Sequence, residues 1–314
     1  MIRRRKLTLL IGGTTVSLSG CLSGDNSTGP TREEGGKAAI DSAEESIDEA
    51  IELITAESSV EFARQPSEPI QTGRITRALD DATIALDRAA DSGATATDQE
   101  IQPYRTYTKI LRSQTSALGS AKQAIDTITA ADVYRQTKRY EDAVTEIHTA
   151  SELLTAGSST VESARVRLED LDIGSLNSNV VNRRRVTDID NNLTRLFNEY
   201  QYYTSATVRF YRGLATYWTG VETYNQARYN EASAVFNEAS NQFDEAKNRY
   251  KDAERAVSPP ARTVFIEQTC VSESMYRSSE QFVEAALAAQ RGDTERAEEY
   301  VNQATTTRNH ECDV

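Results

Sequence analysis

The sequence contains few side chains that could act as nucleophiles or bind a metal ion. Its two histidines are His148 and His310, and its three cysteines are Cys21, Cys270 and Cys312. His148 lies in a helical stretch, where a surface or packing role is expected, and no second group of ligands at metal-binding spacing accompanies His310. The sequence has no glycine-rich phosphate loop, serine elbow or Cys-x-x-Cys pair. We therefore predict no catalytic residue, no metal site and no cofactor.

Cys21 follows a segment with the layout of a secretory signal. Residues 3–6 are basic, residues 7–19 are apolar or small, and small residues lead from there to the cysteine. The apolar stretch is too short to span a bilayer, which takes about 20 residues. A polar stretch rich in glycine and serine follows Cys21, a composition typical of a flexible tether. The order of these parts predicts that the chain is exported.

Two short motifs in this segment resemble those of exported prokaryotic proteins. The letters LSGC, which end at Cys21, resemble the lipobox of prokaryotic lipoproteins, and RRKL, which starts at Arg4, resembles a twin-arginine export signal. The lipobox resemblance implies that residues 1–20 are removed as a signal peptide and that the thiol of Cys21 carries a lipid. It also implies a lipidated tether over residues 21–32. The protein would then be extracytoplasmic, with its lipid in the outer face of the cell membrane.

The chain is strongly acidic. It has 48 acidic and 35 basic residues, a formal net charge of −13, and removal of the four basic residues at positions 3–6 leaves 31 basic residues and a net charge of −17. Only seven of the basic residues are lysines. An acidic composition with scarce lysine resembles that of proteins from halophilic archaea. The negative charge also argues against a nucleic-acid partner, because a binding protein would carry a basic patch.

The rest of the chain is predicted to be all-α. Long stretches lack both proline and glycine, strand patterns are absent, and alanine, glutamate, arginine and leucine recur at helical spacing. The expected helices cover residues 34–56, 70–92, 99–134, 138–156, 159–171, 185–226, 228–256, 260–290 and 294–309. A break is expected at residues 157–159, where Ser159 and Glu162 would form a capping box that starts the next helix.

Four segments share a pattern in which large residues and alanines alternate at helical spacing. Its alanine landmarks are Ala78, Ala143, Ala232 and Ala297. The pattern resembles the second helix of a tetratricopeptide repeat, in which small residues let helices approach closely, and Gly220 matches that family's small residue in the first helix. The landmarks are 65, 89 and 65 residues apart, whereas the family repeats about every 34 residues. We therefore expect an elongated array of four antiparallel helical hairpins that borrows the repeat's packing.

This array divides the chain into parts. Hairpins 1 and 2 are expected over residues 33–156, a short helix and loop over residues 157–184, and hairpins 3 and 4 over residues 185–314. Helix 185–226 carries a seam whose residues are three and four apart, which indicates a partner helix along much of its length. The seam comprises Phe197, Tyr200, Thr204, Thr207, Tyr211, Leu214, Trp218 and Val221.

Tyrosines are concentrated in the third hairpin. Tyr202, Tyr203 and Tyr217 lie off the seam, so they face either another helix or solvent. If they pack inside, they are core residues. If they face outward, they form an aromatic surface that could bind a peptide, a glycan or a hydrophobic ligand. We take these three as the candidate binding surface.

Cys270 and Cys312 are predicted to form a disulfide. If Cys21 is lipidated, they are the remaining thiols, and an extracytoplasmic compartment permits oxidation. Each lies 21 residues from Arg291 at the turn of the last hairpin, so antiparallel packing would bring them to the same level with Cα atoms within about 7 Å. The alternative is a buried apolar Cys270 and a free thiol at Cys312.

Two glycosylation motifs also occur, at Asn26 and Asn192.

The resemblance to tetratricopeptide repeats implies protein–protein interaction, which is an analogy from fold to function. We therefore expect a surface-anchored, non-enzymatic binding or scaffold protein whose partner is an envelope or surface protein. The alternative is a lipoprotein that captures a solute or ligand for a transporter. A long groove lined by tyrosines favours the first, and an enclosed pocket with convergent polar groups the second. An envelope hydrolase would need clustered carboxylates with raised pKa values in a cleft.

Overall fold

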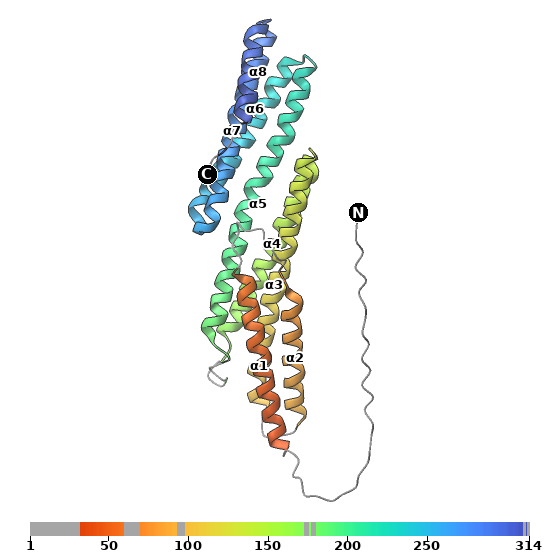
Figure 1. Cartoon of the computed structure of the whole chain (residues 1–314), viewed down its shortest axis with the longest axis vertical. Coiled ribbons are helices and arrows are strands. Elements are labelled where there is room, and N and C mark those ends of the chain that lie inside the picture. Colours follow the sequence, from red (N-terminus) through yellow and green to blue (C-terminus); the bar gives the residue numbers. More distant parts are fainter. Residues whose placement is uncertain are drawn as a thin grey trace, which may run out of the picture.

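The structure is a computed structural model that describes residues 32–59, 70–92, 98–172, 176, 180–309 and 312. All regular secondary structure in these residues is helical, as the sequence predicts, and the helices follow the long axis of the molecule (Figure 1). They are α1 (Arg32–Ser58), α2 (Thr72–Asp91), α3 (Asp98–Gln136), α4 (Tyr140–Glu169), α5 (Arg183–Asn225), α6 (Tyr229–Ala256), α7 (Pro259–Gln290) and α8 (Thr294–Arg308).

Consecutive helices pair into four hairpins, α1–α2, α3–α4, α5–α6 and α7–α8, and each hairpin also packs against the next. In addition, α1 contacts α3 and α5, α3 contacts α5, and α5 contacts α7. Ion pairing of Arg185 with Asp48 joins α5 to α1, and the hydroxyl of Tyr104 donates to Glu44 to join α3 to α1. The odd-numbered helices therefore form one continuous layer, and the even-numbered helices pack on it.

Close approach of α5 and α6 depends on glycines that receive phenylalanine rings. A Cβ atom on Gly220 would lie 2.8 Å from the ring of Phe236, and one on Gly213 would lie 2.7 Å from the ring of Phe243. The first pair lies eight residues on either side of Arg228 and the second pair fifteen, as antiparallel packing requires. A glycine opposite a large ring lets the helix axes come close while the ring fills the space between them.

Three of the hairpins turn in the same way. Lys138, Ala227 and Gly292 follow α3, α5 and α7 with φ values of 61°, 58° and 79°. After each of them, the next backbone N–H donates to a carbonyl five residues earlier, for example Asp293 to Ala288 at 3.0 Å. This pattern satisfies carbonyls that the helix end leaves free. The side chain of Asp293 then caps α8 by accepting from the N–H of Arg296 at 3.2 Å.

The expected break at residues 157–159 is wrong, because α4 runs through these residues without interruption to Glu169. A Cβ atom on Gly157 would lie 2.4 Å from the ring of Phe197 on α5, so this glycine serves close packing and does not end the helix. The hydroxyl of Ser159 donates to the carbonyl of Thr155 at 3.0 Å and caps nothing. The connector predicted over residues 157–184 therefore shortens to the stretch between α4 and α5, and the other predicted helix ends agree within two residues.

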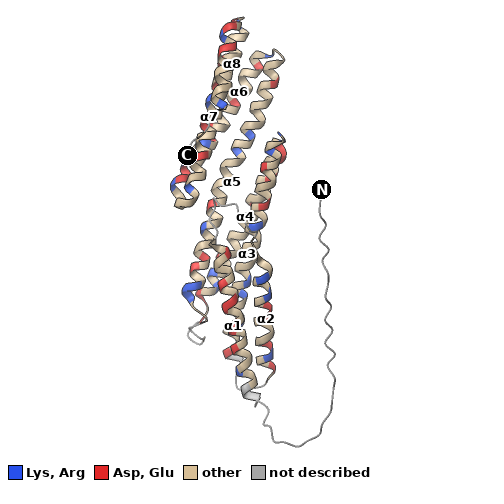
Figure 2. Cartoon of the chain, in the orientation of Figure 1, with Lys and Arg blue, Asp and Glu red and all other residues tan. Residues whose placement is uncertain are grey.

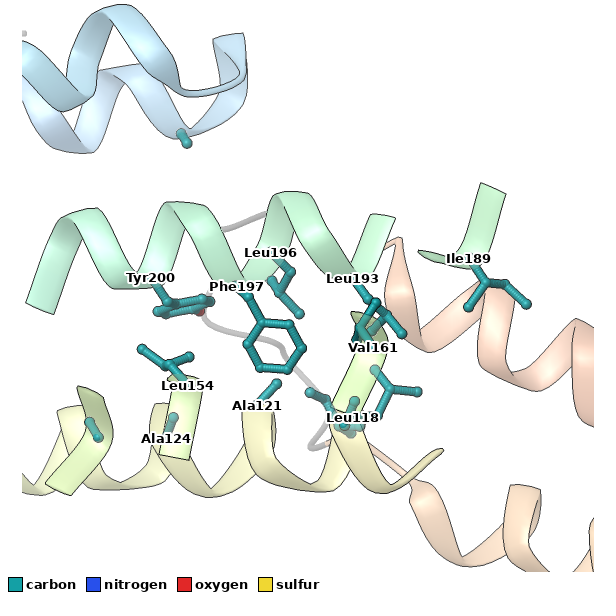
Figure 3. Close-up of a cluster of buried hydrophobic side chains, with 14 of the residues drawn as sticks. Leu118, Ala121, Ala124, Leu154, Val161, Ile189, Leu193, Leu196, Phe197 and Tyr200 are labelled. Atoms are coloured by element: carbon teal, nitrogen blue, oxygen red, sulfur yellow. The ribbon is translucent and has the colours of Figure 1, made fainter. Parts of the chain in front are cut away.

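The core runs along the whole array and contains the residues that the repeat pattern selects. Of the seam on α5, the six residues from Phe197 to Leu214 are buried and the last two, Trp218 and Val221, are half-buried. The four alanine landmarks are buried as well. In Figure 3, Phe197 points from α5 toward Ala121 of α3, with apolar side chains of α3, α4 and α5 around it. The seam therefore does contact partner helices along much of α5.

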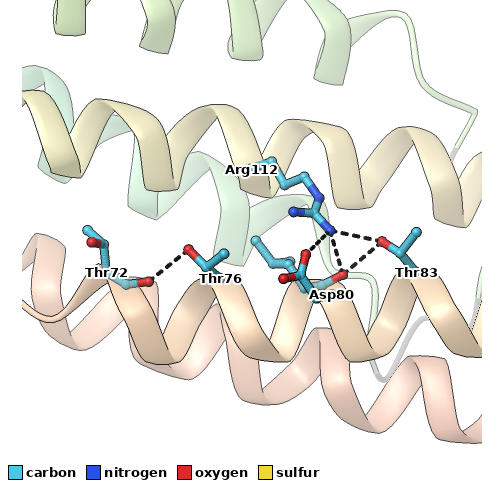
Figure 4. Close-up of polar contacts among 6 residues, drawn as sticks. Thr72, Thr76, Asp80, Thr83 and Arg112 are labelled. Atoms are coloured by element: carbon cyan, nitrogen blue, oxygen red, sulfur yellow. Dashed lines mark hydrogen bonds and ion pairs between the residues drawn. The ribbon is translucent and has the colours of Figure 1, made fainter.

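Arg112 joins the first hairpin to the second. Nη2 of Arg112 on α3 donates to the carbonyl of Leu79 at 3.0 Å and to the hydroxyl of Thr83 at 3.1 Å, and it pairs with Asp80 at 2.7 Å (Figure 4). All three acceptors lie on α2. All three contacts are made by the one nitrogen Nη2, whose two N–H groups are shared among the three acceptors.

Candidate functional site

Tyr217 does not belong to a binding surface, contrary to the prediction, because it is fully buried. Its ring makes edge contacts with Phe236 at 5.7 Å and Phe282 at 5.6 Å between centroids. Its hydroxyl lies 3.0 Å from Oγ of Ser278, which in turn donates to the carbonyl of Ala304 at 2.9 Å. The side chain therefore joins α5 to α7 and α8 inside the core.

The other two predicted tyrosines differ in exposure. Tyr203 is half-buried, with its ring 6.3 Å from that of Tyr250 and 6.4 Å from that of Phe265. Tyr202 is 44% exposed and is one of the few large apolar or aromatic side chains on the surface. The three tyrosines therefore do not form one surface, and of the three Tyr202 is the one that presents an open ring face.

Trp218 holds three hairpins together. Nζ of Lys138, in the turn after α3, lies 4.7 Å from the ring centroid, and the guanidinium of Arg308, at the end of α8, lies 5.3 Å from it. Cations over an indole ring are attracted by its quadrupole. Since α5 carries the ring, these two contacts connect hairpins 2, 3 and 4. The ring of Trp218 is therefore in contact with cations of the protein itself.

A buried carboxyl group lies where α5 crosses α3. Asp190 is 3% exposed, and its Oδ1 accepts from Nε2 of Gln114 at 2.7 Å. Burial raises the pKa of Asp190 to about 6, although the hydrogen bond from Gln114 and the charge of Arg165 lower it, and the charge of Glu162 adds to the rise. Oδ2 of Asp190 and Oε1 of Gln114 are both buried without a donor among the described residues.

Asp190 also lines a cavity of about 350 Å³ between the end of α4 and the start of α5. The guanidinium of Arg183 borders it and donates to the carbonyl of Leu171 at 3.1 Å. A second cavity of about 280 Å³ follows along α5, next to Tyr202, and the two cavities share Asn191. A third, of about 410 Å³, lies between α2 and α3 beside Arg112.

The cysteines lie as the antiparallel spacing predicts. Cys270 on α7 and Cys312 beyond α8 are joined by a disulfide, and their Cα atoms are 6.0 Å apart. Cys21, Asn26 and His310 lie outside the described residues.

The remaining candidate residues lie on helix surfaces. Asn192 is half-buried on α5. His148 is exposed on α4, and its Nε2 lies 3.2 Å from Nη2 of Arg212 on α5. This contact agrees with the surface or packing role expected for His148. In the described part of the chain, no three His, Cys, Asp or Glu side chains gather as metal ligands. The helices described there also lack an apolar stretch of the length that a membrane span requires.

Sequence reasoning missed Asp190, although a signal for it exists. Extending the seam of α5 toward its start by steps of four and three gives Leu193, Asp190 and Val186, so a carboxylate occupies a position that the pattern assigns to the core. No comparable signal identifies Gln114, because its partner lies 76 residues away in the sequence.

The chain matches no protein-family model, no curated protein and no solved structure.

Proposed function

We propose that this protein is a lipid-anchored, non-enzymatic scaffold on the outer face of the cell membrane, which binds another envelope protein through its helical hairpins. The observation that carries the proposal is the continuous layer of odd-numbered helices, in which α1, α3 and α5 contact one another and α5 contacts α7. Stacked hairpins of this kind form extended surfaces that suit protein partners. The pairing of Gly220 with Phe236 supports a packing similar to that of tetratricopeptide repeats.

The anchor rests on the sequence around Cys21, with the twin-arginine-like motif as the export signal. Replacing Cys21 by serine should move the protein from the membrane fraction to the soluble fraction or the medium, because the lipid is lost. A separate variant, in which Cys21 is kept and Arg4 and Arg5 are both changed to lysine, tests the export route. A Cys21→Ser protein that stays with the membranes would contradict the lipid anchor.

The scaffold function is tested by crosslinking from two positions of similar exposure. Val133 lies on α3, in the odd-numbered layer, and is 54% exposed, whereas Ile84 lies on α2 and is 49% exposed. A photoreactive amino acid at Val133 should give a discrete protein adduct in intact cells, and the same group at Ile84 should give much less. Equal adducts from both positions, or none from Val133, would remove the proposal.

A second candidate function is capture of a soluble ligand by a lipoprotein that serves a transporter. The observation that favours it is the pair of joined cavities along α5, whose lining includes side chains of both charges, such as Arg165 and Asp190. Cavities with a few convergent polar groups are typical of small-ligand sites. Purified protein that retains or binds a small molecule at this site, while Val133 gives no adduct in cells, would favour ligand capture over scaffolding.

A further inference from the structure

One exposed face of α5 carries uncharged polar side chains over four turns. Its members are spaced three or four residues apart, which places them in one row about 22 Å long at 1.5 Å per residue. The row consists of Thr187, Asn191, Thr194, Asn198 and Tyr202, all exposed. In a chain in which 26% of the residues are charged, such a row stands out. Acidic and basic side chains are otherwise spread over all the helices (Figure 2).

This row forms the floor of the two joined cavities. The first cavity is walled by the end of α4, including Arg165 and Glu169, and the second by the corner between α6 and α7 at Ser258. The two cavities meet at Asn191, and we call them together the furrow; Tyr202, at its far end, has an exposed ring.

Two buried polar atoms at the furrow lack partners among the described residues. They are Oδ2 of Asp190, a residue that lines the first cavity, and Nε of Arg195, a residue that lines the second. The amides of Asn191 and Asn198 each add both a donor and an acceptor. The furrow therefore offers both kinds of hydrogen-bonding group along its length, and it offers an aromatic face at one end.

We propose that this furrow binds a neutral oligosaccharide. Each sugar hydroxyl both donates and accepts hydrogen bonds, which matches the mixed donors and acceptors of the asparagines and of the walls. The apolar face of a sugar ring can pack on Tyr202. Three arginines and three carboxylates line the two cavities, so their charges balance and favour neither an anionic nor a cationic ligand. Leu168 and Ala256 are the apolar side chains of the lining, which gives little anchorage for a hydrophobic peptide.

This inference names the ligand class for the second candidate function and is independent of the scaffold proposal. The test is isothermal titration calorimetry of the full-length protein with maltohexaose, cellohexaose, xylohexaose and chitohexaose. At least one should bind, with an affinity that is the same in low and high NaCl because the ligand carries no charge. Tyr202→Ala should weaken that binding at least tenfold, whereas Tyr300→Ala, which removes a half-exposed tyrosine on α8, should leave it unchanged.

The outcomes separate the alternatives. Failure of all four oligosaccharides to bind, or equal affinity of the Tyr202→Ala protein, would overturn the inference. Binding that weakens strongly with NaCl would indicate a charged ligand and would overturn it as well. Since Tyr202 is exposed, the variant should keep its circular dichroism spectrum and melting temperature, so a loss of affinity would report on the furrow. The crosslinking experiment at Val133 is unaffected by any of these results.

Discussion

At the scale of single residues, burial makes the ionised form of Asp190 unfavourable. With the carboxylate charged, Oδ2 of Asp190 and Oε1 of Gln114 are two buried acceptors without a donor. A buried polar atom without a hydrogen bond costs about 1–3 kcal/mol. A proton on Asp190 would supply a donor, since a carboxylic acid and a primary amide can pair through two hydrogen bonds. The raised pKa of Asp190 and this hydrogen-bond deficit therefore point in the same direction.

This residue should make stability depend on pH. Because the pKa of Asp190 rises from 3.8 to about 6 on folding, its stabilising contribution is full below pH 3.8 and is lost as pH rises through 6. The loss should reach roughly 3 kcal/mol of unfolding free energy. Asp190→Asn places a neutral amide there, so it should remove this slope and be more stable than the wild type at pH 8. Urea denaturation between pH 4 and 8 measures both, with the exposed Asp188→Asn as control; parallel slopes for wild type and Asp190→Asn would contradict the prediction.

Two glycines inside helices should respond to alanine in opposite ways. At Gly213 a Cβ atom would lie 2.7 Å from the ring of Phe243, so Gly213→Ala should lower the unfolding free energy by roughly 1–3 kcal/mol. At Gly119 nothing lies within 4 Å of the added atom. Gly119→Ala should therefore stabilise α3 by roughly 0.5–1 kcal/mol, since alanine loses less backbone entropy in a helix. Thermal unfolding of the two variants measures both changes in stability. A stabilised Gly213→Ala protein would contradict the prediction and show that the ring of Phe243 moves aside at no cost.

At the scale of helices, the sequence predicts where most of them begin and end, because apolar spacing and turn residues are local signals. Gly157 misleads because its reason lies on another helix, where Phe197 needs the space. Tyr217 misleads for a related cause. A heptad seam reports one partner helix, but α5 contacts α6 and α7 as well as α4, so a residue off the seam is buried by a second partner. Neither contact can be read from one helix at a time.

The last helix should depend on its disulfide. The bond between Cys270 and Cys312 closes a loop with a sequence separation of 42, for which chain entropy predicts roughly 4 kcal/mol less any strain. Arg308, which lies over Trp218, is four residues before Cys312, so release of the tail should also alter the environment of that ring. Cys312→Ser should lower the melting temperature and change the fluorescence of Trp218, the single tryptophan. The Cys270→Ser, Cys312→Ser double variant should behave the same. If a reducing agent changes neither signal in the wild type, the bond does not hold α8.

At the scale of the whole molecule, an excess of carboxylates over an elongated surface should make the fold sensitive to salt. The chain carries a formal net charge of −13, and acidic side chains lie on every helix (Figure 2). Self-repulsion of this kind destabilises the compact state. The Debye length shortens from about 30 Å at 0.01 M salt to about 3 Å at 1 M, so salt should screen it. We expect the melting temperature at pH 8 to rise steadily with NaCl and to rise equally with KCl, because screening depends on ionic strength. The rise should be smallest near pH 4.8, the isoelectric point of the sequence, where the net charge is close to zero. A melting temperature that is flat or falls with added salt would show that the ion pairs between helices, such as Arg112 with Asp80, outweigh the net repulsion.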